Sequence, residues 1–185
     1  MTILVVNNKG QYNHRILRTL QNLKIPAELV QNTLSIDEIK DKDPSGLILG
    51  GGPSLDLAGN SSDYIDNINV PILGICLGHQ LIAKKFGSEI STSNTESYAQ
   101  VEINILKDND LLKDLGSSTP VWTSHKDEVN NLPSNFELLA NSKVCDIEAM
   151  KHLDKDIYGI QFHPEVHHTP KGEIIFNNFY DICKR

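Results

Sequence analysis

The sequence predicts an α/β fold: a mostly parallel central sheet flanked by helices, with extra strands in the second half. Short apolar segments alternate with helix-patterned segments through the first half of the chain, which is typical of parallel strands joined by crossover helices. Strand-like segments predominate in the second half. The chain has 185 residues without an internal repeat or linker, so we expect one domain over residues 1–185.

The predicted elements of the first half follow one another as strand and helix. The apolar residues 3–6 indicate a buried strand, and Ile16, Leu20 and Leu23 recur at helical spacing. Ser35 is a suitable N-cap for a short helix, and residues 43–46 have the composition of a turn. The series is strand 3–6, helix 14–23, strand 27–30, helix 35–40, strands 47–49 and 70–75, and a helix through 81–86 that ends at Gly87.

The second half is predicted to consist mainly of strands, closed by one helix. The polar stretch 91–97 is the best candidate for a mobile surface loop. The predicted strands are 101–106, 121–123, 136–140, 147–152 and 157–162, and the helix is 172–183.

Composition excludes several classes of protein. The net charge of −7 argues against nucleic acid or an anionic membrane as the main partner. No apolar stretch approaches the ~20 residues that a membrane helix needs, and residues 1–6 resemble a strand rather than a signal peptide. Three cysteines without metal-site spacing suit a reducing compartment, so we expect a cytoplasmic protein.

Residues 71–80 form the most informative segment, in which an apolar strand ends in Gly-x-Cys-x-Gly before a helix-compatible stretch. This is the layout of a nucleophile elbow with Cys76 in the place of serine. Gly74 and Gly78 allow the strand and the helix to pack closely. The helix N-terminus favours the thiolate form of the sulfur. Cys145 and Cys183 lack such surroundings and are interpreted as packing residues.

A second segment, residues 157–166, supplies a base for the cysteine. An alternating apolar strand ends in His163-Pro164-Glu165, and Pro164 favours an extended backbone at His163. Side chains at i and i+2 then point to the same side, so Glu165 can orient the imidazole. Cys76, His163 and Glu165 are therefore the predicted catalytic triad. No metal site is predicted, because the spacing of His163, His167 and His168 fits no zinc pattern.

The Gly-Ile-Cys-Leu-Gly-His-Gln and Phe-His-Pro-Glu-Val segments together resemble the triad, or class I, glutamine amidotransferases. The resemblance runs from residue 3 to about residue 179 and includes a Gly-Gly-Gly-Pro loop at 50–53. It implies a flavodoxin-like architecture and an oxyanion hole built from the amides of Gly52 and Leu77. It also implies substrate contacts from Gln80 and from Ser124, His125, Lys126 and Asp127. Gly50 stands where relatives more often have serine.

Three segments resemble the glutaminase subunits of two-subunit GMP synthetases, an arrangement typical of archaea. They are residues 8–12, 124–129 and 164–169. This resemblance implies that the chain hydrolyses L-glutamine through a thioester and passes ammonia to an ATP-pyrophosphatase subunit, which converts XMP to GMP. It implies no cofactor in this chain, because ATP and magnesium are used by the partner.

Alternative functions stay open at this point. The amidotransferase subunits of anthranilate and aminodeoxychorismate synthase share the cysteine motif, but they typically have Pro-Gly-Pro-Gly at the oxyanion loop. A stand-alone cysteine-elbow hydrolase typically lacks a C-terminal His-x-Glu. A catalytically silent regulatory subunit would not need Cys76, His163 and Glu165 together.

Overall fold

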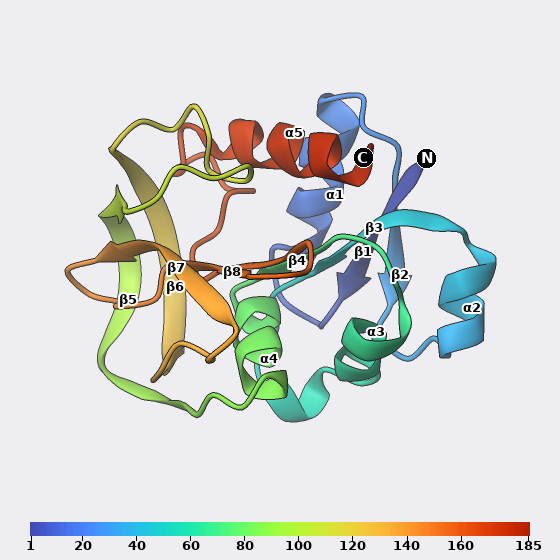
Figure 1. Ribbon diagram of the computed structural model, residues 1–185, viewed down its shortest axis with the longest axis horizontal. Helices are drawn as coiled ribbons and strands as arrows, with labels where there is room; N and C mark the ends of the chain where they lie inside the picture. The colour runs from blue at the N-terminus through green and yellow to red at the C-terminus, as the bar shows by residue number, and fades with distance from the viewer.

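Parallel and antiparallel strands meet in one mixed sheet with helices on both faces (Figure 1). The structure is a computed structural model that describes residues 1–185, apart from the side chains of residues 94–96. In the described chain this sheet has nine strands. The predicted fold class, including the extra strands of the second half, is confirmed.

The parallel half of the sheet holds five strands. In spatial order they are β2 (Ala27–Gln31), β1 (Thr2–Asn7), β3 (Pro44–Leu49), β4 (Ile72–Ile75) and β9 (Ile157–Ile160). This is the flavodoxin-like order, in which the direction of winding reverses between β1 and β3. Ligands of such sheets bind outside the carboxyl ends of the strands near that reversal.

Helices cover both faces of the parallel half. One face carries α1 (Asn13–Asn22) and α5 (Gly172–Cys183), and the other carries α2 (Ile36–Asp41), α3 (Ser61–Asn67) and α4 (Leu77–Lys85) (Figure 1). Residues of β1 alternate between the two layers: Val5 packs with α1 and α5, whereas Val6 packs with the other three helices. Both layers are apolar, as expected for strands that are buried on both sides.

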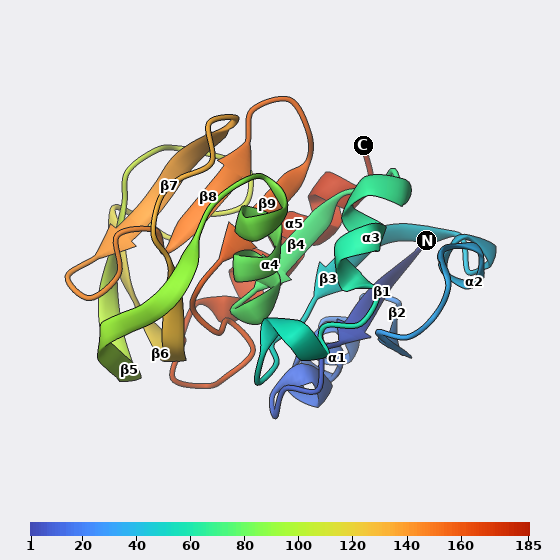
Figure 2. The same cartoon turned by 90° about the horizontal axis from the view of Figure 1, so that it is seen from below.

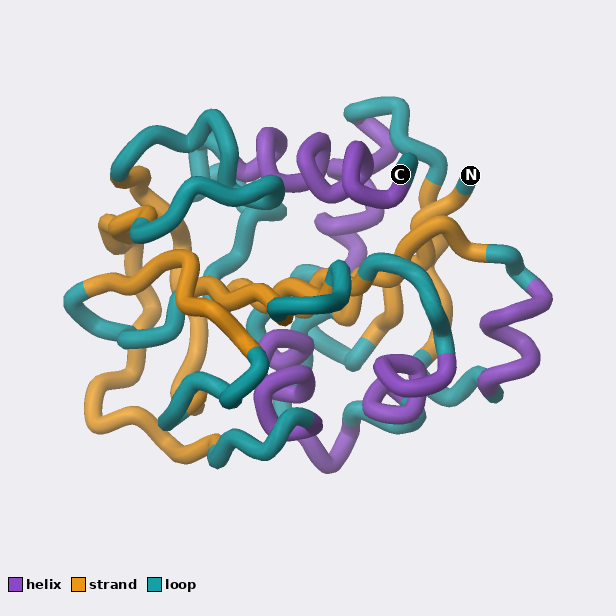
Figure 3. The backbone as a smooth tube through the Cα atoms, in the orientation of Figure 1, coloured by secondary structure: helices purple, strands orange, loops and turns teal.

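The antiparallel half extends the sheet beyond β9. Its strands are β8 (Ala149–His152), β7 (Phe136–Ser142), β5 (Ile90–Ile105) and β6 (Ser118–Val129), in that order. Figure 2 shows them on the side of the molecule away from β2, and Figure 3 shows that most helices gather around the other half. β6 also contacts the segment that follows β9. There the amide of His163 donates to Trp122 O at 2.9 Å.

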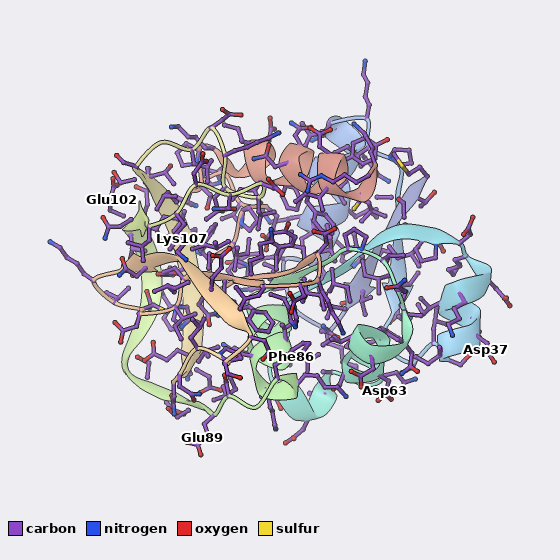
Figure 4. The ribbon with its side chains drawn as sticks, viewed as in Figure 1. Asp37, Asp63, Phe86, Glu89, Glu102 and Lys107 are labelled. Carbon is purple, nitrogen blue, oxygen red and sulfur yellow. The ribbon has the colours of Figure 1, made fainter. Side chains whose placement is uncertain are left out.

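The end of α4 joins the two halves. Phe86, which follows α4, packs edge-on against Phe136 of β7, with ring centroids 5.0 Å apart (Figure 4). Charged side chains such as Glu89 and Glu102 lie at the periphery of the view in Figure 4. α4 is therefore enclosed between the parallel strands and the antiparallel half, and its residues 77–83 are buried.

Several sequence expectations are confirmed. The helix predicted at 172–183 coincides with α5, and the Gly87 expected to end α4 has φ +96°. Ser35 caps α2 in a capping box: its side chain accepts from the Glu38 amide, and the Glu38 carboxylate accepts from the Ser35 amide.

Other expectations are wrong. The turn predicted at 43–46 is wrong beyond Asp43, because β3 already begins at Pro44. The stretch 91–97 lies within β5 instead of a loop, with a break in the pairing between Thr92 and Ser97; the side chains of 94–96 lie outside the described residues. α3 and the short 3₁₀ helix Leu55–Leu57 were not predicted, because neither is long enough to show a helical period.

Within the described residues, none of the helices is both long enough and apolar enough to cross a membrane.

Candidate active site

A pocket of about 320 Å³ opens at the carboxyl ends of β1, β3, β4 and β9. This is the place where a flavodoxin-like sheet binds its ligands. A larger groove of about 610 Å³ lies beside α4, but none of the three predicted triad residues lines it. The residues lining the smaller pocket are Lys9, Gly10, Gln11, Tyr12, Gly51, Gly52, Pro53, Cys76, Ser124 and His163.

Cys76 occupies a strained turn between β4 and α4. Its φ of 54° and ψ of −103° belong to a region that L-residues rarely adopt. The flanking glycines are required by space: a Cβ at Gly78 would lie 2.0 Å from Leu49 O, and one at Gly74 would lie 2.4 Å from Gly78 O. The predicted elbow geometry is therefore present, with the sulfur at the N-terminus of α4.

His163 and Glu165 meet as the sequence predicted. His163 Nδ1 lies 2.6 Å from Glu165 Oε1, and both side chains are buried. The Thr169 hydroxyl donates to His163 O at 2.6 Å, which holds the backbone of the histidine in place. Tyr12 packs edge-on against the imidazole, with centroids 5.0 Å apart.

The environment of His163 favours its protonated form. Burial alone lowers its pKa, but the charges of Glu165 and Cys76, and hydrogen bonds to both, outweigh burial. The pKa of His163 therefore lies well above its usual 6.5. An imidazolium beside the sulfur stabilises a thiolate, which is the nucleophilic form of cysteine.

The Gly-Gly-Gly-Pro loop is held firmly against β1 and α1. Asn8 Nδ2 donates to Gly50 O at 3.0 Å, and Gly51 O accepts from Asn13 Nδ2 at 3.0 Å and from the Gly10 amide at 3.1 Å. A Cβ at Gly50 would lie 2.1 Å from Asn13 Oδ1, so the close packing of Asn13 explains glycine at this position.

Gly52 and Leu77 lie next to each other. A Cβ at Gly52 would come within 2.6 Å of Leu77 Cδ2 and 2.2 Å of Asn8 O. In the part of the chain that the structure describes, neither the Gly52 amide nor the Leu77 amide donates a hydrogen bond to a protein acceptor. Unpaired backbone donors close to a nucleophile are what a developing oxyanion requires.

The predicted substrate-binding residues do not all face the pocket. Ser124 lines it, but Gln80, for which the resemblance implies a substrate contact, is 4% exposed and turned inward, because α4 is enclosed by β6. Its Nε2 donates to Asp127 O at 2.7 Å.

The segment 124–129, whose charged composition favours a loop after the predicted strand 121–123, belongs instead to that strand. It is the end of β6 and pairs with β5, and its side chains are divided between the interior and the solvent. His125 points inward and is buried, and burial lowers its pKa. Lys126 and Asp127 are exposed, and Asp127 Oδ1 accepts from Thr92 Oγ1 at 2.9 Å.

Sequence reasoning missed Gln161, whose Nε2 donates to Cys76 Sγ at 3.6 Å. The signal was a polar residue within an otherwise apolar strand, directly before the Phe162-His163 pair. Among the described residues, no group of three or more His, Cys, Asp and Glu side chains is arranged to hold a metal ion.

The fold and the cysteine elbow define a class of protein. The sequence matches the family description "Glutamine amidotransferase class-I" over residues 4–183, and the chain belongs to this family.

Particular relatives within the family are closely similar. The chain is 68% identical to a subunit of glutamine-hydrolyzing GMP synthase from Methanobrevibacter smithii, covering 100% of this chain and 97% of that protein. The protein of the same name from Methanothermobacter thermautotrophicus is 60% identical, covering 98% of each chain.

Solved structures agree with this placement. A putative GMP synthase subunit from Thermoplasma acidophilum has a TM-score of 0.94 at 38% identity, covering 100% of this chain and 94% of that one. A glutamine amidotransferase from Thermotoga maritima has a TM-score of 0.74 at 19% identity, covering 98% and 83%, and supports the fold alone.

Proposed function

We propose that this chain is the glutaminase subunit of a two-subunit GMP synthase and hydrolyses L-glutamine to glutamate and ammonia. One observation carries the proposal: Cys76 and His163, distant in sequence, line one pocket in a chain of this family, and His163 is paired with Glu165. The names of the relatives support GMP synthesis in preference to anthranilate or aminodeoxychorismate synthesis.

In the proposed reaction, the Cys76 thiolate attacks the side-chain amide carbon of glutamine. The amides of Gly52 and Leu77 donate to the oxyanion of the tetrahedral intermediate. The imidazolium of His163 gives its proton to the departing nitrogen, so ammonia leaves and a thioester remains. His163 then removes a proton from water, which attacks the thioester, and glutamate departs as Cys76 returns to the thiolate.

Glu165 has an orienting role in this scheme. Its carboxylate holds Nδ1 of His163, so Nε2 is the nitrogen available to the sulfur and the substrate. Ser124 is the residue of the 124–127 segment in direct reach of glutamine, because it lines the pocket. Lys126 and Asp127 lie at the surface, where glutamine or the partner protein can contact them.

The relatives are named as subunits, which implies a second chain. We propose that it is an ATP-pyrophosphatase that binds ATP, magnesium and XMP and aminates the activated nucleotide with ammonia from this chain. No cofactor is assigned to this chain. A cytoplasmic location is part of the same proposal, supported by Cys76, Cys145 and Cys183, which are all free thiols.

The proposal is tested by measuring glutamate release and GMP formation in the presence of ATP, magnesium and XMP, with and without a cognate ATP-pyrophosphatase. Cys76→Ala is expected to abolish both activities with glutamine, whereas GMP formation from added ammonium chloride persists, because the partner keeps its own site.

Cys145→Ala is the matched control, because Cys145 is a buried thiol outside the pocket; it should retain activity. Glutamate release by Cys76→Ala at the wild-type rate would contradict the assignment of the nucleophile. Equal activity without the partner and nucleotide would favour a stand-alone hydrolase.

A further inference from the structure

A chain of side-chain amides runs from the nucleophile into the interior. Gln161 Nε2 lies 3.6 Å from Cys76 Sγ, and Gln161 Oε1 lies 3.2 Å from Gln80 Nε2. Gln80 Nε2 in turn lies 2.7 Å from Asp127 O on β6. The reaction proposed above uses neither glutamine.

The chemistry of the last acceptor determines which end of each amide donates in this series of hydrogen bonds. Asp127 O is a backbone carbonyl and can only accept, so it requires the NH₂ end of the Gln80 amide. The second N–H of Gln80 then meets the oxygen of Gln161. The NH₂ end of Gln161 is left facing the sulfur, so the sulfur must be an acceptor in this contact.

Burial makes this contact matter. Gln161 is completely buried and Gln80 is 4% exposed, so water does not compete for their hydrogen bonds. A hydrogen bond to an ionised acceptor is roughly twice as strong as one to a neutral acceptor, so an N–H aimed at sulfur favours the thiolate.

A second neighbour of the sulfur has the opposite chemistry. Ser124 O lies 3.8 Å from Cys76 Sγ and can accept only from the protonated thiol. Gln161 and the imidazolium of His163 are thus the groups that favour the charged form, and Ser124 O favours the neutral form.

We propose that Gln161 is a further catalytic residue, whose amide N–H holds the reacting sulfur of Cys76 as the thiolate. Gln80 is the positioning residue that orients the Gln161 amide, anchored on the strand that carries Ser124. This inference rests on the proposed role of Cys76 as nucleophile. The inference also gives a function to the inward orientation of Gln80. Its amide does not face the pocket but acts on the sulfur through Gln161.

The test measures the reactivity of Cys76 directly, without glutamine. Inactivation by iodoacetamide is followed from pH 5 to pH 10, with mass spectrometry on Cys76, for the wild type and three variants. Gln161→Met keeps the length of the side chain but removes the donor, and Gln161→Glu keeps the shape but places a carboxylate on the sulfur. Gln80→Met leaves Gln161 in place without its partner.

We expect the pH midpoint of inactivation to rise by about one unit in Gln161→Met, because a lost charge-assisted bond corresponds to about that shift. The rise should be larger in Gln161→Glu and smaller in Gln80→Met. With nucleotide and the partner protein present, kcat should fall roughly tenfold in Gln161→Met while KM changes less than about twofold.

Gln21→Met, on the exposed face of α1, is the control for a glutamine-to-methionine change and should match the wild type. Thermal melting establishes that each variant is folded. If Gln161→Met does not fold, Gln80→Met decides the question through the same midpoint. Wild-type midpoints in the folded variants would overturn the inference even if Cys76→Ala is inactive. If the midpoint shifts in the variants but the wild type releases no glutamate even with the partner and nucleotide, the inference is upheld and the proposed function is refuted.

Discussion

The backbone strain at Cys76 predicts that replacing this residue by glycine gives a more stable protein than replacing it by alanine. Cys76 adopts φ 54° and ψ −103°, and a Cβ in such a conformation costs about 1–3 kcal/mol. Replacement by Gly or by Ala removes the same sulfur, but only glycine also removes the Cβ. Glycine in turn costs about 0.5–1 kcal/mol through the greater freedom of the unfolded chain.

The net expectation is that Cys76→Gly has a free energy of unfolding about 1 kcal/mol higher than that of Cys76→Ala. For a chain of this size the difference corresponds to roughly 2–4 °C in Tm. Urea unfolding and thermal melting of the two variants measure it, and both variants should release no glutamate from glutamine.

Ala99→Gly is the control for the sign of this effect. Ala99 is exposed on β5 and is not among the described residues with positive φ, so glycine there should cost about 0.5–1 kcal/mol. If Cys76→Gly is less stable than Cys76→Ala, the elbow does not store backbone strain, and the reasoning fails.

Three further predictions concern titratable groups. Glu165→Gln removes the carboxylate that raises the pKa of His163, so kcat should fall by roughly 10²–10⁴ with a modest change in KM, and the alkaline limb of the kcat–pH profile should move to lower pH; a normal kcat would remove Glu165 from the triad. Burial raises the pKa of Glu148 to about 7 from 4.5, so the folded state binds the extra proton and the wild type loses stability as pH rises through that window. Between pH 4.5 and pH 8 the free energy of unfolding of the wild type, measured in urea, should fall by roughly 3 kcal/mol more than that of Glu148→Gln. Parallel pH profiles of the wild type and the variant would contradict this prediction. Burial raises the pKa of both the Cys145 and Cys183 thiols, the latter to about 12, so iodoacetamide at pH 7 should label Cys76 alone in the native wild type, and labelling of Cys183 would contradict this.

Local features of the site followed directly from the sequence. The Gly74–Cys76–Gly78 pattern predicts the elbow, because a Cβ at Gly74 would clash with Gly78 within the same turn. The i, i+2 spacing of His163 and Glu165 predicts their contact for the same reason, since it depends on a few neighbouring dihedral angles. The cap at Ser35 is similarly local.

The composition of the pocket needed the tertiary structure. Strand order decides that β6 passes beside the elbow, so a segment with the composition of a solvated turn becomes a paired strand. The same packing turns Gln80 away from the pocket and onto Asp127 O, and it brings Gln161 to the sulfur.

The sequence alone therefore determined the order of elements, the elbow, the His–Glu pair and the family to which the chain belongs. Tertiary structure alone decided which polar side chains share the interior with Cys76 and how they are charged. The physical reason is that burial and long-range hydrogen bonds depend on which surfaces pack together. Gln80 and Asp127 are 47 residues apart, and residues that distant carry no local signal of their contact.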